Sequence, residues 1–308
     1  MVFLALSPTM AAMNYAAAPA PYESENPDPN AAPTPTGAHT NMQQQLNRII
    51  ASLNPPQQEA ATHLNGALLV LAGAGTGKTR VLTTRLANLI ATGTAQPMNI
   101  MAVTFTNKAA KEMAERIEQL IGTSTAGMWL GTFHALGARL LRRHAERMGL
   151  RPDFTILDTD DQKRLLTELL QQANIDTTTN PARVLAGIIS TWKDNAWLPE
   201  DVPAGEDSFA GGKARGLYAR YQSRLKALNA CDFGDLLLLP VHLFKHHNDV
   251  LAEYQNQLTH VLVDEYQDTN AVQYLWLRLL TMTNKNICVV GDDDQSIYGW
   301  RGAQVGNI

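Results

Sequence analysis

The sequence has 308 residues, of which 45% are hydrophobic and 18% charged, a composition that can bury a substantial core. Its formal net charge is −4, so the chain is not broadly basic, and a nucleic-acid role would require a local positive groove. The chain has only two cysteines and no apolar run of the roughly 18 residues that a membrane helix needs, so we expect no disulfides, no membrane span and a cytoplasmic location.

The first 44 residues differ in composition from the rest of the chain. They contain no lysine or arginine and hold seven of the fifteen prolines. Little of such a segment could form a packed core, so we expect residues 1–44 to be a disordered Ala/Pro-rich arm. A misassigned start is the alternative, because Met13 and Met42 are both plausible initiators.

An α/β pattern begins at about residue 45. Residues 67–71 are apolar on both faces of the predicted strand, as in a parallel sheet that helices cover on both sides. Helical periodicity follows this strand and recurs between the later ones. Such alternation predicts a parallel sheet with right-handed crossovers. Further strands are predicted at residues 99–104, 128–131, 260–263 and 286–290.

Strand signals disappear between about residues 150 and 230. Residues 160–172, 182–193 and 216–228 have helical periodicity instead. We therefore expect a mainly helical insertion that interrupts the α/β core.

A glycine-rich motif between the first strand and its helix matches the P-loop pattern, with alanine at the usual first glycine. The glycines let backbone N–H groups surround phosphates, and the helix N-terminus favours an anion. Lys78 would hold the β- and γ-phosphates, and the Thr79 hydroxyl would bind Mg²⁺. The motif therefore predicts an Mg·ATP site. Its residues are Ala72, Gly73, Ala74, Gly75, Thr76, Gly77, Lys78 and Thr79.

Two carboxylates, Asp264 and Glu265, follow the apolar strand at residues 260–263. In P-loop ATPases, an aspartate at this point completes the Mg²⁺ shell. An adjacent glutamate can act as a general base toward the attacking water. An apolar run that ends in two acids is common by chance, but the upstream P-loop favours the catalytic interpretation.

Several further segments occur together in one protein family. They are Gln57 within Leu53-Asn54-Pro55-Pro56-Gln57-Gln58-Glu59-Ala60, the P-loop continuing into Arg80, Thr104-Phe105-Thr106-Asn107-Lys108-Ala109-Ala110, Gly131-Thr132-Phe133-His134, Asp264-Glu265-Tyr266-Gln267-Asp268, and Gly291-Asp292-Asp293-Asp294-Gln295-Ser296-Ile297-Tyr298-Gly299-Trp300-Arg301-Gly302-Ala303. With these motifs in order, residues 45–308 resemble superfamily 1 DNA helicases of the UvrD/PcrA/Rep group, and its UvrD members most closely.

The resemblance implies roles for individual residues. Gln57 would read the adenine edge and Arg80 would pack against the base. Lys78 and Glu265 would be catalytic, together with Gln295, which would touch the γ-phosphate and couple it to the DNA site. Residues along single-stranded DNA would be Phe105, Thr106, Asn107, Thr132, His134, Phe233, Tyr298, Trp300 and Arg301.

Aromatic faces stack on any base, which suits a motor that does not read sequence. Without the resemblance, a core position would be the favoured interpretation for Phe105 and Phe233. The polar and glycine neighbours of Tyr298 and Trp300 make burial less attractive there.

The resemblance also implies the domain organisation and the activity. Residues 45–132 and 250–308 would form the first RecA-like, ATP-binding domain 1A, and residues 133–249 the helical insertion 1B. A second RecA-like domain is absent from the sequence given. The implied activity is that of an ATP-dependent 3′–5′ DNA helicase acting on single-stranded DNA and on junctions with duplex, with repair or replication proteins as partners. The alternatives are a truncated ATP- and DNA-binding module without helicase activity, and a helicase-nuclease relative.

Overall fold

The computed structural model describes residues 2–5, 37–73, 75–122 and 124–292. Six strands form one sheet in the order β1-β2-β8-β7-β3-β4. The strands are β1 (Val2–Ala5), β2 (Leu68–Leu71), β3 (Ile100–Thr104), β4 (Trp129–Thr132), β7 (His260–Val263) and β8 (Ile287–Gly291). All neighbouring pairs are parallel except β1 with β2. The five parallel strands lie within one residue of the predicted positions.

The helices connect these strands and cover the sheet. They are α1 (Gly37–Ala51), α2 (Pro55–Thr62), α3 (Lys78–Ala91), α4 (Asn107–Ile121), α5 (Phe133–Arg143), α6 (Thr159–Gln172), α7 (Ala182–Asp194), α8 (Ala214–Ala227), α9 (Asp235–His246), α10 (Asn248–Gln257) and α11 (Ala271–Thr281). None of the helices in the described part of the chain is long and apolar enough to cross a membrane.

The strands are apolar on both faces because each face packs against helices. Along β3, Ile100 and Ala102 belong to the core formed with α1–α4, whereas Met101 and Val103 belong to the core formed with α5, α9, α10 and α11. This alternation follows from the two-residue period of a strand. The α/β fold with a covered parallel sheet is therefore confirmed.

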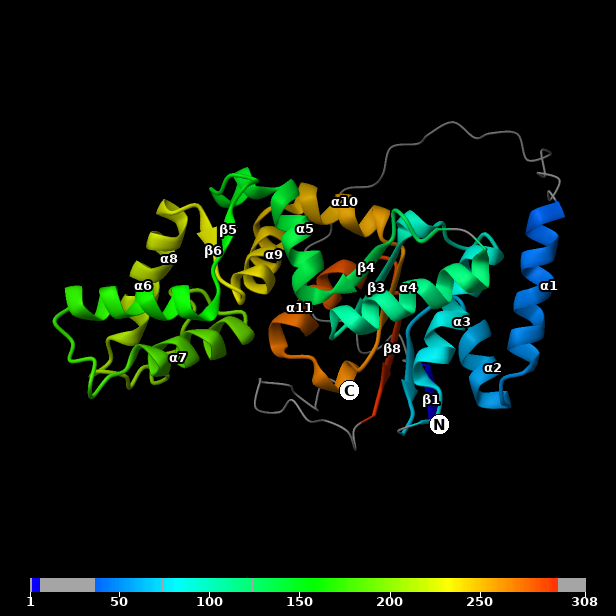
Figure 1. Cartoon of the computed structure of the whole chain (residues 1–308), viewed down its shortest axis with the longest axis horizontal. Helices are drawn as coiled ribbons and strands as arrows, with labels where there is room; N and C mark the ends of the chain where they lie inside the picture. Colours follow the sequence, from blue (N-terminus) through cyan, green and yellow to red (C-terminus); the bar gives the residue numbers. More distant parts are fainter. Residues whose placement is uncertain (1, 6–36, 74, 123, 293–308) are drawn as a thin grey trace.

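Helices α6, α7 and α8 extend from one side of the sheet region and have a core of their own (Figure 1). A short parallel ladder links β5 (Thr155–Ile156) to β6 (Ala230–Cys231) at the base of this unit. Helices α5 and α9 fall within the predicted insertion, residues 133–249, but share the core of the sheet. The separately packed helical unit thus comprises α6–α8, while helices α5 and α9, at the ends of the predicted insertion, pack on the sheet.

The N-terminal region also differs from the predicted arm. Residues Val2–Ala5 form β1, which pairs antiparallel with β2. Helix α1 begins at Gly37, and its Leu46 is buried in the core with α3 and α4. Residues 2–5 and 37–44 therefore belong to regular elements. The apolar residues 2–5 pair with the strand β2, and the helix that begins at residue 37 is held to the core by Leu46.

Candidate functional site

The P-loop connects the end of β2 to the first residue of α3. Gly75 and Gly77 have φ angles of 70° and 84°, in the left-handed region that disfavours other residues. The Thr76 hydroxyl donates to the Gly73 carbonyl at 2.7 Å and tightens the turn. The Ala72 N–H donates to the Gly291 carbonyl at 3.0 Å and anchors the loop to β8. These contacts define a tight turn between β2 and α3. Ala74 lies outside the described residues.

Lys78 is buried at the start of α3, with 8% of its surface exposed. Its Nζ lies 3.6 Å from Asp292 Oδ2 and 3.8 Å from Glu265 Oε2, but it makes no hydrogen bond within the described part of the chain. A buried ammonium has three donors to satisfy, so this one is available to an anion. It faces an open pocket of about 370 Å³, whose walls are Gly75, Gly77, Lys78, Thr79, Arg80, Arg116 and Glu265.

Asp264 is buried at the end of β7, close to Thr79. Its burial and the neighbouring Glu265 raise the pKa of Asp264 to about 6, although Lys78 and the Thr79 hydroxyl act in the opposite direction. A buried carboxylate whose charged form is disfavoured can accept a cation, and Mg²⁺ prefers oxygen donors such as a carboxylate and a hydroxyl. The chemistry of Asp264 and Thr79 therefore fits Mg²⁺.

Glu265 has a strained backbone and a fixed side chain. Its φ and ψ angles are 50° and 46°, a conformation that non-glycine residues adopt rarely and often at functional sites. Gln267 Nε2 donates to Glu265 Oε2 at 2.7 Å, while Gln267 Oε1 accepts from the Asp292 N–H at 3.0 Å. Gln267 thus joins the end of β7 to the end of β8. Sequence reasoning gave Gln267 no role, because no local pattern indicates that the two strand ends are neighbours.

The predicted adenine contacts, Gln57 and Arg80, lie next to the P-loop. Gln57 Nε2 donates to the Thr76 carbonyl at 2.9 Å, and Gln57 Oε1 accepts from the Asn54 N–H at 3.1 Å as part of the cap of α2. Arg80 Nη2 donates to Ser52 Oγ at 2.8 Å. Their contacts with a base stay predictions.

A second group of predicted residues lies after β3 and β4. Because these strands are parallel neighbours, their carboxyl ends meet at one edge of the sheet. Thr106 and Thr132 each accept a hydrogen bond from the backbone N–H three residues later, at 3.1 and 3.2 Å, and so begin α4 and α5. Residues Phe105, Asn107 and His134 adjoin these caps, so the structure brings the first five predicted DNA contacts to the same edge.

Phe233 joins this group from a distant part of the sequence. Its ring stacks on His134 with a centroid distance of 3.8 Å and an interplanar angle of 19°, and 58% of its surface is exposed. The core interpretation is therefore wrong for Phe233. It holds for Phe105, which is partly buried against the core and meets the Phe133 ring edge-on at 6.0 Å.

The remaining predicted site residues lie outside the described residues. They are Gln295, Tyr298, Trp300 and Arg301. Their segment follows β8 in the sequence.

Comparison with known proteins gives consistent matches. Residues 53–308 match the family model of the UvrD/REP helicase N-terminal domain. A probable DNA helicase II homolog of Rickettsia felis is 51% identical over 263 residues, which is 84% of this chain and 40% of that protein. The DNA helicase II of Rickettsia typhi is 48% identical over 86% of this chain and 40% of its own length. The ATP-dependent DNA helicase PcrA of Staphylococcus epidermidis is 44% identical over 85% of this chain and 36% of its own. The chain thus spans well under half of these relatives.

Proposed function

Because the chain belongs to the UvrD/REP helicase family, we propose that it binds and hydrolyses Mg·ATP as the first RecA-like motor domain of a 3′–5′ DNA helicase. The observation that carries this proposal is the buried Lys78 ammonium, which has two carboxylates nearby, no hydrogen bond within the described residues, and an open pocket before it. A phosphate group would supply the missing acceptors.

The residues of the site have distinct tasks in this proposal. Thr79 and Asp264 would hold Mg²⁺, which would supply positive charge to the phosphates. Glu265 takes the proton of the attacking water, and Gln267 fixes the carboxylate that does so. Gln57 and Arg80 orient the base.

Single-stranded DNA is the proposed second ligand. It would lie along the carboxyl edge of β3 and β4, over the exposed Phe233 ring stacked on His134. Base stacking on an aromatic ring contributes roughly 1–3 kcal/mol without reading sequence. The nucleotide pocket lies at the same edge of the sheet. Hydrolysis at the bound phosphates could therefore move the residues that follow the strands, and these residues would contact the DNA.

The domain division also belongs to this proposal. We assign residues 45–132 and 250–308 to domain 1A, with α5 and α9 packed on it and α6–α8 as the body of the insertion.

The test is ATP hydrolysis by the chain, with and without oligo-deoxythymidine. We expect DNA-stimulated turnover that is abolished by Lys78→Ala and by Glu265→Gln, with nucleotide binding retained in Glu265→Gln. Turnover that persists in both variants would show that another protein or another site is responsible, and would refute the assignment.

A second candidate is an ATP- and DNA-binding module without unwinding activity of its own. Binding of both ligands without turnover, in the experiment above, would select this candidate.

A further inference from the structure

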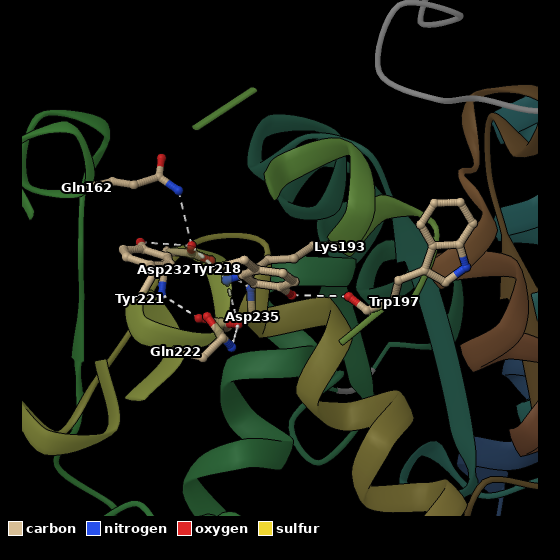
Figure 2. A network of polar contacts seen from close by, with 8 residues as sticks. All are labelled: Gln162, Lys193, Trp197, Tyr218, Tyr221, Gln222, Asp232 and Asp235. Atoms are coloured by element: carbon tan, nitrogen blue, oxygen red, sulfur yellow. Dashed lines mark hydrogen bonds and ion pairs between the residues drawn. The ribbon is translucent and has the colours of Figure 1, made fainter. Parts of the chain in front are cut away.

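A buried cluster of charged side chains lies where the helical unit meets α9. Lys193, at the end of α7, places its Nζ 2.7 Å from Asp232 Oδ2 and 2.7 Å from Asp235 Oδ1 (Figure 2). All three side chains are almost completely buried. Burial alone would lower the pKa of Lys193, but the two carboxylates outweigh it and raise that pKa, so the lysine stays charged.

Further donors from the helical unit complete the cluster. The Tyr221 hydroxyl donates to Asp232 Oδ2 at 3.0 Å, and Gln162 Nε2 donates to the same oxygen at 3.1 Å. Gln222 Nε2 donates to Asp235 Oδ1 at 3.0 Å. Helices α7 and α8 therefore contact both aspartates, and α6 contacts Asp232.

The aspartates in turn define the backbone between them. The Asp235 N–H donates to Asp232 Oδ1 at 2.9 Å, and the Asp232 N–H donates to Asp235 Oδ2 at 3.1 Å. Gly234 packs so closely on Lys193 that a Cβ at this position would lie 2.8 Å from the lysine Cδ. The segment 232–235 is thus fixed by hydrogen bonds from both ends and by contact with the lysine.

Phe233 is the one residue of this segment whose side chain points to solvent, with 58% exposure and its ring stacked on His134. A buried ion cluster is seldom the most stabilising solution, since apolar side chains of similar volume are often as stable. Its hydrogen bonds do, however, specify one geometry. That geometry is the backbone of segment 232–235, which carries the Phe233 ring.

We propose that the Lys193–Asp232–Asp235 cluster is a positioning device that ties the helical unit α6–α8 to the Phe233–His134 stack and holds that stack as a platform for one nucleobase. The use of the platform by DNA rests on the proposed function. The positioning itself does not, because it concerns contacts within the chain. A shift of the helical unit relative to the sheet would move Phe233 with it and change the affinity for the base.

The first experiment measures the position of Phe233 directly, through the ring-current shift of the His134 side-chain protons in histidine-labelled chain. The Phe233→Ala variant gives the chemical shift of the His134 protons in the absence of the stacked ring. The test variant is K193M/D235N, which removes one cation and one carboxylate and so leaves the net charge of the cluster unchanged. The matched control is Tyr218→Phe, which removes a hydrogen bond to the Trp197 carbonyl from the same helical core but none to the aspartates.

We expect the His134 shift in K193M/D235N to fall to the Phe233→Ala value, and the Tyr218→Phe control to keep it. A shift that stays unchanged in folded K193M/D235N would overturn the proposal. If that variant does not fold, Tyr221→Phe replaces it, since it removes only one donor to Asp232. A partial loss of the shift would then support the proposal, and an unchanged shift would overturn it.

The second experiment measures the affinity for fluorescent oligo-deoxythymidine. Phe233→Ala and K193M/D235N should each weaken binding by roughly 5- to 150-fold, the equivalent of one base stack. Because both changes remove the same platform, the triple variant should bind no more weakly than either. If the affinity of the triple variant falls by the product of the two separate losses, the platform role is overturned. If the unaltered chain binds no DNA, the proposed function fails, while the His134 shift still decides the positioning.

Discussion

Gln267 donates a hydrogen bond to Glu265 at 2.7 Å and accepts one from the backbone N–H of Asp292 at 3.0 Å. One buried amide therefore holds the proposed general base and the end of the neighbouring strand together. Gly291 leaves room for this arrangement, because a Cβ there would lie 2.8 Å from Gln267 Oε1.

The first prediction concerns this amide. Gln267→Leu removes both hydrogen bonds and leaves the buried Asp292 N–H without its acceptor, so the free energy of unfolding should fall by about 2–4 kcal/mol. ATP turnover should fall more than ATP binding, because Glu265 loses its orientation. Urea unfolding and hydrolysis assays measure the two effects. Gln273→Leu is the control: this glutamine is also buried and caps α11, so it should lower stability only. Equal loss of turnover in both variants would contradict the role of Gln267.

The second prediction concerns pH. The pKa of Asp264 is raised to about 6, above the value of about 3.9 for an unfolded chain. Below pH 6 the carboxyl is protonated, and Mg²⁺ must compete with that proton, so Mg²⁺-dependent nucleotide affinity should fall up to tenfold per pH unit. Stability changes in the opposite sense: the native state binds this proton more tightly than the unfolded chain, so the contribution of Asp264 to stability rises as pH falls from 6 toward 4.

Titration of the chain with a fluorescent ATP analogue between pH 5 and 8 tests this prediction. Nucleotide binding without Mg²⁺ serves as the reference at each pH. Asp264→Asn should remove most of the Mg²⁺ dependence at every pH. A Mg²⁺ effect that is constant across the range would contradict the raised pKa.

The sequence predicts the five parallel strands well because each is buried on both faces and so forms a short apolar run, while the helical patterns between them indicate the α/β alternation. The nucleotide site is predictable for a similar reason, since the P-loop is contiguous and its glycines have a local cause. Gly75 and Gly77 have positive φ angles, which other residues rarely adopt.

Long-range contacts account for what the sequence does not predict. Lys193 and Asp232 lie 39 positions apart, and nothing in their local sequence indicates that they meet. His134 and Phe233 are farther apart still, so a phenylalanine considered alone suggests the core until its stacking partner is known. The packing of α9 is also a long-range property, because its apolar face does not reveal which core it joins.

The third prediction separates the two phenylalanines of the proposed DNA-binding edge, Phe105 and Phe233. Phe233→Ala removes an exposed ring, so it should weaken binding of single-stranded DNA by about 1–3 kcal/mol and leave the unfolding midpoint nearly unchanged. Phe105→Ala removes a ring that packs against Phe133, so it should lower stability by about 2 kcal/mol. Fluorescence anisotropy and urea unfolding measure both variants. A large stability loss in Phe233→Ala would show that its ring is structural.

The fourth prediction compares two helical glycines. Gly137 in α5 faces the backbone of α9, and a Cβ there would collide with the Leu236 carbonyl oxygen, an atom that cannot move without shifting the helix. Gly137→Ala should therefore lower the free energy of unfolding by about 3 kcal/mol or more. Gly187 in α7 is exposed, and a Cβ added there would meet open space, so Gly187→Ala should raise stability by about 0.5–1 kcal/mol through helix propensity. Urea unfolding of the two variants gives both values. If the two variants are equally stable, α5 and α9 do not pack as closely as the structure shows. The relative positions of His134 and Phe233, which these helices determine, would then be in error.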